Sequence, residues 1–185
     1  MEVKSILRQS LPLLILCGVG EIFAGRVFGG MVHFLEILPG LIVLIPAIMG
    51  LKGYIDITLG SRLGSAVHTG LIAPGNIWNV ETKENVFASL GLGIIMAVVA
   101  GILAHVTCII LGLPSIGIIK LIGIALLAGI LAGVILAFLT IGIIILSFKR
   151  GYDPDNITAP LLATGGDIIT LGCIFIITYF IIEVV

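Results

Sequence analysis

The sequence predicts an all-α integral membrane protein with five transmembrane helices. Hydrophobic residues make up 59% of the 185 residues, charged residues only 10%, and the mean hydropathy is +1.34. A soluble domain carries about 25% charged residues, so this chain has too few to cover a water-exposed surface. Its apolar residues gather in five runs, each long enough for a helix to cross a bilayer. The net charge of −1 also excludes a strongly basic nucleic-acid-binding protein.

The predicted spans cover residues 10–31, 35–70, 85–111, 116–148 and 158–185. The second span is too long for one straight crossing and contains Pro46, so we expect a kink or break at Gly50–Gly53. The fourth span also exceeds one bilayer thickness and is expected to tilt or protrude. Together the spans predict one membrane domain over residues 1–185, without a cytosolic regulatory domain.

Basic residues in the loops orient these spans. If the N-terminus is cytoplasmic, the cytoplasmic side receives Lys4, Arg8, Lys83, Lys149 and Arg150. The outer loops then offer only Lys120. Cytoplasmic loops carry an excess of Lys and Arg. We therefore expect a multi-pass cell-membrane protein with a cytoplasmic N-terminus and an extracellular C-terminus.

Ionised residues within the spans mark the candidate site, because a charged group at the centre of a spanning helix costs about 2.5–3.5 kcal/mol. In the second span, Lys52, Asp56, Gly60, Gly64 and His68 follow one another at a spacing of four. Neighbouring members of such a series lie on one face of a helix, so Lys52 can neutralise Asp56. Two interpretations are open: a buried ion pair that only fixes packing, or a polar wall on the path of an ion.

Asp167, in the last span, has no basic residue near it in the sequence. Ala163, Thr164 and Thr170 share its helix face, and Pro160 frees carbonyl oxygens in the preceding turn. Carboxylate, hydroxyl and carbonyl oxygens suit a hard cation. Mg²⁺ needs only one or two carboxylates, because it retains several of its waters. The alternative is a protonated Asp167 that hydrogen-bonds between helices.

Three further acids lie on or near this path. Glu21, in the first span, is expected either to pair with another helix, for example through Lys52 or Arg62, or to take a place on the ion path. Asp153 and Asp155 precede the last span, where they either cap the helix or collect divalent cations in an acidic vestibule. Catalytic patterns such as H-E-x-x-H and G-x-S-x-G are absent from the sequence, so an enzyme is not expected.

Two segments resemble a known family. The run PAIMGLKGYIDITLGSRLGSAVHTG resembles the P-x-x-x-GLKG…E-x-TLASRLST segment of solute carrier family 41. The run DPDNITAPLLATGGDIITL resembles the DPDN-x-x-x-P…T-x-x-GD segment of the same family. These proteins belong with the membrane domain of the MgtE magnesium transporters and channels.

The resemblance implies a homodimer of five-helix units that conducts Mg²⁺ through a pore between the two units. It also implies that Asp167 holds a largely hydrated Mg²⁺, that the carbonyl of Ala163 lies one turn earlier, and that Asp56 is the acid of the second-span motif. Relatives commonly have Glu at the position of Asp56, and Tyr54 stands where they usually have Asn.

We therefore expect a divalent-cation transporter or channel, surrounded by membrane lipids, that prefers Mg²⁺ but has Mn²⁺ or another divalent ion as alternative cargo. Two other hypotheses stay open. One is Mg²⁺ exchange coupled to Na⁺ or H⁺, with Glu21 and Asp56 binding the coupling ion. The other is a non-transporting membrane scaffold whose polar residues only lock the helices together.

Overall fold

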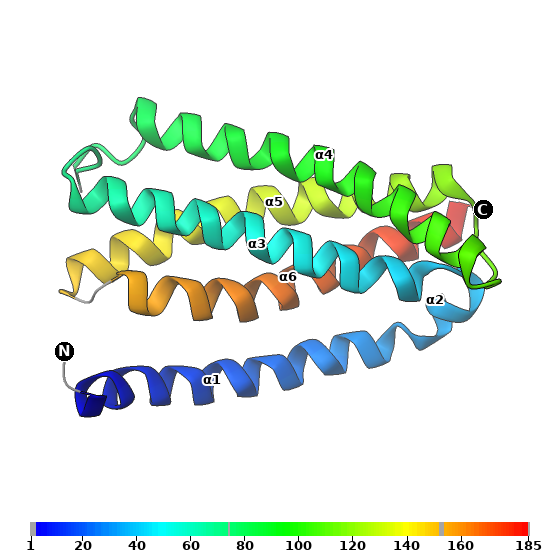
Figure 1. Ribbon diagram of the computed structural model, residues 1–185, viewed down its shortest axis with the longest axis horizontal. Coiled ribbons are helices and arrows are strands. Elements are labelled where there is room, and N and C mark those ends of the chain that lie inside the picture. The colour runs from blue at the N-terminus through cyan, green and yellow to red at the C-terminus, as the bar shows by residue number, and fades with distance from the viewer. Residues whose placement is uncertain (1–2, 74, 152–153, 185) are drawn as a thin grey trace.

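The computed structural model describes residues 3–73, 75–151 and 154–184, which form a bundle of long helices (Figure 1). The elements are α1 (Val3–Gly30), α2 (Val32–Ile37), α3 (Leu41–His68), α4 (Val80–Ile110), α5 (Ile118–Lys149) and α6 (Pro154–Val184). Five of these helices are long and apolar enough to cross a membrane, which confirms the predicted fold class. The candidate spans are Ser10–Gly30, Leu41–His68, Val80–Ile110, Ile118–Lys149 and Ile157–Ile182.

The second predicted span is divided earlier than expected. Helix α2 ends at Ile37, and α3 then runs without interruption from Leu41 to His68. The break expected at Gly50–Gly53 is not confirmed, because α-helix continues through both glycines. Instead the chain turns at Pro39, which disfavours helix in the residue before it, and at Gly40, whose φ of 94° lies in the left-handed region that favours glycine.

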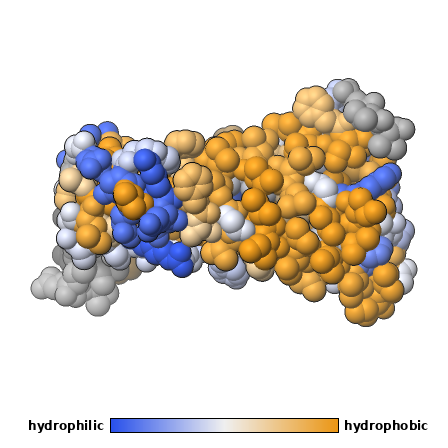
Figure 2. Space-filling view, turned by 90° about the horizontal axis from the view of Figure 1, so that it is seen from above, coloured by the Kyte–Doolittle hydropathy of each residue, from blue (hydrophilic) through white to orange (hydrophobic). Residues whose placement is uncertain are grey.

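The molecular surface has the pattern expected of a membrane protein. Figure 2 shows a broad apolar zone, with most of the hydrophilic residues gathered towards the two ends of the molecule. Large hydrophobic side chains are exposed on the long helices, including Ile22, Phe87, Phe138 and Phe180. In water such a surface would promote aggregation, whereas in a bilayer these side chains face lipid tails.

Helix α1 lies at the edge of the bundle (Figure 1). Helix α6 contacts α1, α3 and α5, whereas α1 packs mainly along α6 and touches the short α2. Only 11% of the most apolar stretch of α1 is buried, compared with 28–39% in the other four spans. The core therefore consists of α3, α4, α5 and α6. Helix α1 forms a peripheral arm that packs along α6.

Candidate functional site

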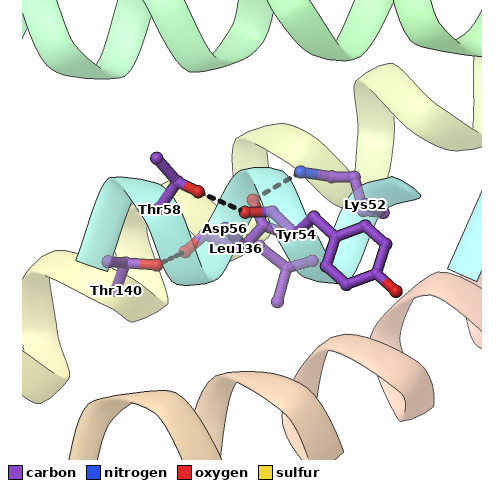
Figure 3. Close-up of polar contacts among 6 residues, drawn as sticks. All are labelled: Lys52, Tyr54, Asp56, Thr58, Leu136 and Thr140. Carbon is purple, nitrogen blue, oxygen red and sulfur yellow. Dashed lines mark hydrogen bonds and ion pairs between the residues drawn. The ribbon is translucent and has the colours of Figure 1, made fainter. Parts of the chain in front are cut away.

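Lys52 and Asp56 form a buried ion pair on α3 (Figure 3). The Lys52 ammonium donates a hydrogen bond to Asp56 Oδ1 at 2.6 Å, and the two side chains are 6% and 2% exposed. Gly133 of α5 lies beside the lysine, since a Cβ there would be in ordinary contact with Lys52 Nζ at 3.5 Å. The ion pair predicted from the spacing of four is therefore present, and Asp56 has its own counter-charge.

The next turn of α3 packs tightly against α6 through Gly60. A Cβ at Gly60 would lie 2.8 Å from Cγ2 of Thr158 on α6 and 3.7 Å from Cγ2 of Thr140 on α5. Thr140 donates its hydroxyl to the carbonyl oxygen of Leu136 at 2.7 Å (Figure 3). Asp56 Oδ2 and Thr158 Oγ1 are buried without a hydrogen-bond partner in the part of the chain that the structure describes. The polar side chains of Asp56, Thr140 and Thr158 therefore lie between helices of the same chain.

Asp167 lies on the side of α6 that faces between α1 and α3, not on the side that packs against Gly60. The contacts of three neighbours define the sides of this helix: Thr164 lies against α1, Leu162 against α3 and Gly165 against α5. Successive helical residues turn by about 100°. Asp167 therefore points into the sector between α1 and α3, away from α5, and its side chain is half-buried. Ala163, one turn earlier, lies in the same sector and is exposed.

A groove opens between α1 and α3 along this side of α6. It has a volume of about 470 Å³ and is lined by residues of all three helices. These include Glu21, Gly25, Pro46, Met49 and Leu171. Leu171 lies one helical turn beyond Asp167, so the groove follows the same side of α6. Glu21 is the one charged residue among those that line it.

Helices α1 and α6 run side by side and parallel (Figure 1), and two contacts fix their register. Cys17 Sγ lies 3.5 Å from the carbonyl oxygen of Pro160. One turn later, Gly20 lies directly against Thr164.

One further expectation about the acids is not met, and another concerns residues that the structure does not fully describe. The pairing of Glu21 with Lys52 or Arg62 is not found among the described residues, because the ion pair recorded there joins Lys52 to Asp56. Asp153 lies outside the described residues, and at Asp155 only the backbone, in the first turn of α6, is described. The acidic vestibule stays a prediction.

The remaining candidate ligands lie on α6, within one turn of Asp167. Thr164 is half-buried against α1, and Thr170 is 1% exposed with a hydroxyl that has no partner within residues 3–73, 75–151 and 154–184. No group of three or more His, Cys, Asp or Glu side chains that could hold a metal ion occurs in these ranges. The described part of the chain therefore holds no closed metal cage.

Comparison with known proteins gives consistent results. The family model MgtE, described as a divalent cation transporter, matches residues 45–177. The chain is 34% identical over 177 residues to solute carrier family 41 member 2 of Xenopus laevis and of Homo sapiens, which covers 89% of this chain and 30% and 29% of those relatives. It is 33% identical over 179 residues to solute carrier family 41 member 3 of Rattus norvegicus, covering 92% of this chain and 38% of the relative. The chain therefore spans only 29–38% of the length of these relatives. No solved structure gives a significant match.

Proposed function

The chain belongs to the MgtE family of divalent cation transporters, and from this premise we propose that it moves Mg²⁺ across the membrane past Asp167. The observation that carries the proposal is the environment of this carboxylate. It lies within a membrane span, on the side of α6 between α1 and α3, and forms no ion pair with a basic side chain in the described part of the chain. An ionised group in a span needs compensation, and a passing cation supplies it.

The chemistry and size of the groove support a hydrated divalent ion. Mg²⁺ is octahedral, binds oxygen ligands and gives up its waters reluctantly. Six waters of about 30 Å³ each occupy about 180 Å³, which is well below the groove volume of about 470 Å³. The Asp167 carboxylate accepts hydrogen bonds from the ion's waters, and Ala163, an exposed residue one turn earlier, supplies its carbonyl oxygen. Mn²⁺, which prefers similar oxygen ligands, is the alternative cargo.

The proposal includes a homodimer. In one protomer the groove has walls from α1 and α3 and a floor from α6, and its open side would expose Glu21 and Asp167 to lipid. Intramembrane acids almost always face a bundle interior or a water-filled cavity. A second copy related by a two-fold axis closes the groove and brings two Asp167 carboxylates to one pore. Their mutual repulsion then favours a shared cation.

Flux measurements in proteoliposomes test the site. Asp167→Asn keeps the shape of the side chain and removes its charge, so we expect it to abolish Mg²⁺ flux while the dimer persists. The matched control is Glu84→Gln, at an exposed acid near the start of α4 and outside the groove, which should transport like wild type. Unchanged flux in Asp167→Asn would remove Asp167 from the site. Wild-type proteoliposomes that pass no divalent cation would overturn the function itself.

The same preparation separates the competing hypotheses. Mg²⁺ flux that follows an imposed Na⁺ or pH gradient would indicate coupled exchange, with Glu21 or Asp56 as the binder of the coupling ion. A scaffold would show no flux. In a scaffold, Asp167→Asn and Asp56→Asn would change thermal stability without any effect on cation binding.

A further inference from the structure

The exposed side of α3 differs from that of its neighbour α5. All of α3 is described, and Ile42 and Tyr54 are the only large hydrophobic residues that it exposes. From residue 50 onwards its other exposed residues are glycine or polar: Gly50, Thr58, Ser61, Arg62, Ser65 and His68. Helix α5, by contrast, exposes large apolar side chains such as Leu127 and Phe138. Polar residues within membrane spans almost always face a bundle interior or a water-filled cavity, so this side of α3 is suited to water and α5 to lipid.

Tyr54 is the most unusual residue on this side. Its side chain is 73% exposed near the middle of α3, about 20 Å from either end of the helix. Tyrosines that face lipid gather at the membrane interface, where the hydroxyl meets water, and Tyr54 is too far from both ends for that. The backbone carbonyl of Tyr54 accepts a hydrogen bond from the Thr58 hydroxyl at 2.7 Å, whereas its own hydroxyl has no partner among the described residues (Figure 3). Water beside α3 would satisfy this hydroxyl.

The Tyr54 ring points away from the buried ion pair. Successive helical residues turn by about 100°, so Tyr54 lies roughly opposite Lys52, whose ammonium is beside Gly133 of α5. Figure 3 shows the ring directed away from the Lys52 side chain. The ring therefore lies outside the core of the protomer, on the side of α3 that is free of α5.

Tyr54 and Asp167 lie at about the same depth in the bundle. Helices α3 and α6 pack against each other in opposite directions (Figure 1), and a Cβ at Gly60 would lie 3.0 Å from Cδ1 of Leu162. At 1.5 Å per residue, Tyr54 lies about 9 Å along α3 from this contact. Asp167 lies about 7.5 Å along α6, in the same direction. A cation held at Asp167 is therefore level with the Tyr54 ring.

We propose that Tyr54 lines the water-filled cation path at the depth of Asp167, and that its ring limits the size of the hydrated cation that passes. This inference rests on the proposed function and adds a specificity-determining residue to it. Gly50 and Gly53, beside Tyr54, have no atom within 4 Å of the position that a Cβ would take, so the ring is the bulkiest group on this part of α3. Mg²⁺ keeps a compact octahedral shell, whereas Ca²⁺ takes about 6–8 oxygen ligands at longer distances. A path that is narrow beside the ring therefore favours Mg²⁺.

The ratio of Mg²⁺ to Ca²⁺ flux in proteoliposomes tests the role of the ring. Tyr54→Ala removes the ring and should lower this ratio about tenfold, the lower end of what a small change in the size of a site produces. Tyr54→Phe keeps the ring and should keep the wild-type ratio. Phe87→Ala, at an aromatic residue of α4 that is 67% exposed, is the matched control and should also keep it. An unchanged ratio in Tyr54→Ala, or an equal fall in Tyr54→Phe or Phe87→Ala, would overturn the role of the ring.

Thiol labelling tests the position of residue 54 independently of transport. The test uses the full chain in lipid nanodiscs, with its three cysteines replaced by alanine. Tyr54→Cys should react with a charged methanethiosulfonate, because a thiol in water can ionise and the thiolate is the nucleophile. Phe87→Cys, expected to face lipid, should stay unlabelled. An unreactive Tyr54→Cys in a chain that transports Mg²⁺ would place residue 54 outside the path and overturn the proposal.

The outcomes for Tyr54 differ from those for transport. If Tyr54→Ala keeps the wild-type ratio while Asp167→Asn abolishes Mg²⁺ flux, the role of Tyr54 is wrong and the proposed function stands. If Tyr54→Cys is labelled but the wild type passes no divalent cation, the water-facing position of residue 54 stands, whereas the proposed function and the size limit both fail. Tyr54 is exposed, so its substitution should leave thermal unfolding unchanged, and Tyr54→Cys covers the case in which Tyr54→Ala does not fold.

Discussion

At the scale of single residues, the carboxylates of two aspartates in one membrane domain have opposite surroundings. Asp56 is held by an ammonium on its own helix at 2.6 Å and is sealed between helices. Asp167 is half-buried on the side of α6 between α1 and α3 and forms no ion pair in the described part of the chain. A carboxylate that already holds an ammonium has less affinity left for a metal ion. The two environments therefore favour a packing role for Asp56 and a cation-binding role for Asp167.

The buried ion pair predicts a large and asymmetric effect of substitution. Lys52→Met keeps most of the side-chain volume but leaves the Asp56 carboxylate buried and unpaired, so it should lower the free energy of unfolding by about 3–5 kcal/mol. Lys52→Met combined with Asp56→Leu removes both charges and should recover most of that loss. Thermal or denaturant unfolding in detergent measures both. Lys83→Met, at an exposed lysine, is the control and should change stability by no more than about 0.5 kcal/mol. A double variant as unstable as Lys52→Met would contradict this account of the pair.

These residues also indicate how far the site was predictable from sequence. The Lys52–Asp56 pair follows from a spacing of four on one helix, and the structure confirms it. Asp167 was selected because no basic residue lies near it, and its role stays a prediction. The position of Glu21 relative to α6 was not predictable, since it depends on the register of two helices whose residues are more than 140 positions apart. The one local signal is Gly20, which permits the close approach.

At the scale of helices, glycines determine how closely neighbouring helices approach. A Cβ at Gly101 of α4 would lie 2.7 Å from Cα of Ile122 on α5. Because the obstacle is backbone, a side-chain movement cannot relieve it. Gly60 has a comparable role between α3 and α6, but there the neighbouring atoms belong to side chains. The α4–α5 contact is therefore the more rigid of the two.

This contact gives a prediction with a control on the same helix. Gly101→Ala should force α4 and α5 apart and lower the free energy of unfolding by about 1–3 kcal/mol, the usual cost of overpacking. Gly91 has no atom within 4 Å of the position that a Cβ would take. Gly91→Ala should therefore be neutral or stabilise the helix by up to about 1 kcal/mol. Unfolding of both variants in the same detergent checks the prediction, and equal stabilities would show that the α4–α5 approach does not depend on Gly101.

Helix boundaries show where sequence reasoning about the fold succeeded and where it failed. Hydropathy and length identified all five spans, because a bilayer imposes both on the chain. The break in the second span was expected at Gly50–Gly53 but lies at Leu38–Gly40. Glycine is tolerated inside membrane helices when neighbouring helices support them. Glycine alone therefore did not locate the break, whereas Pro39 followed by a left-handed Gly40 does.

At the scale of the whole molecule, the odd number of spans places the two termini at opposite ends of the bundle (Figure 1). The end that carries the N-terminus also carries the α3–α4 and α5–α6 connections. Lys83, Lys149 and Arg150 lie beside these connections and are exposed. Lys120, also exposed, lies at the start of α5, at the opposite end. The distribution of basic residues predicts that the first end is cytoplasmic.

Cysteine labelling in intact cells tests this orientation directly. The chain has three cysteines, Cys17, Cys108 and Cys173, all buried, and replacing them with alanine gives a background without thiols. In that background, Lys120→Cys should react with a membrane-impermeant maleimide added outside the cells. Lys83→Cys should react only after the membrane is permeabilised. Both positions are exposed lysines near the starts of long helices, so they differ chiefly in the side of the membrane. The reverse pattern would invert the topology.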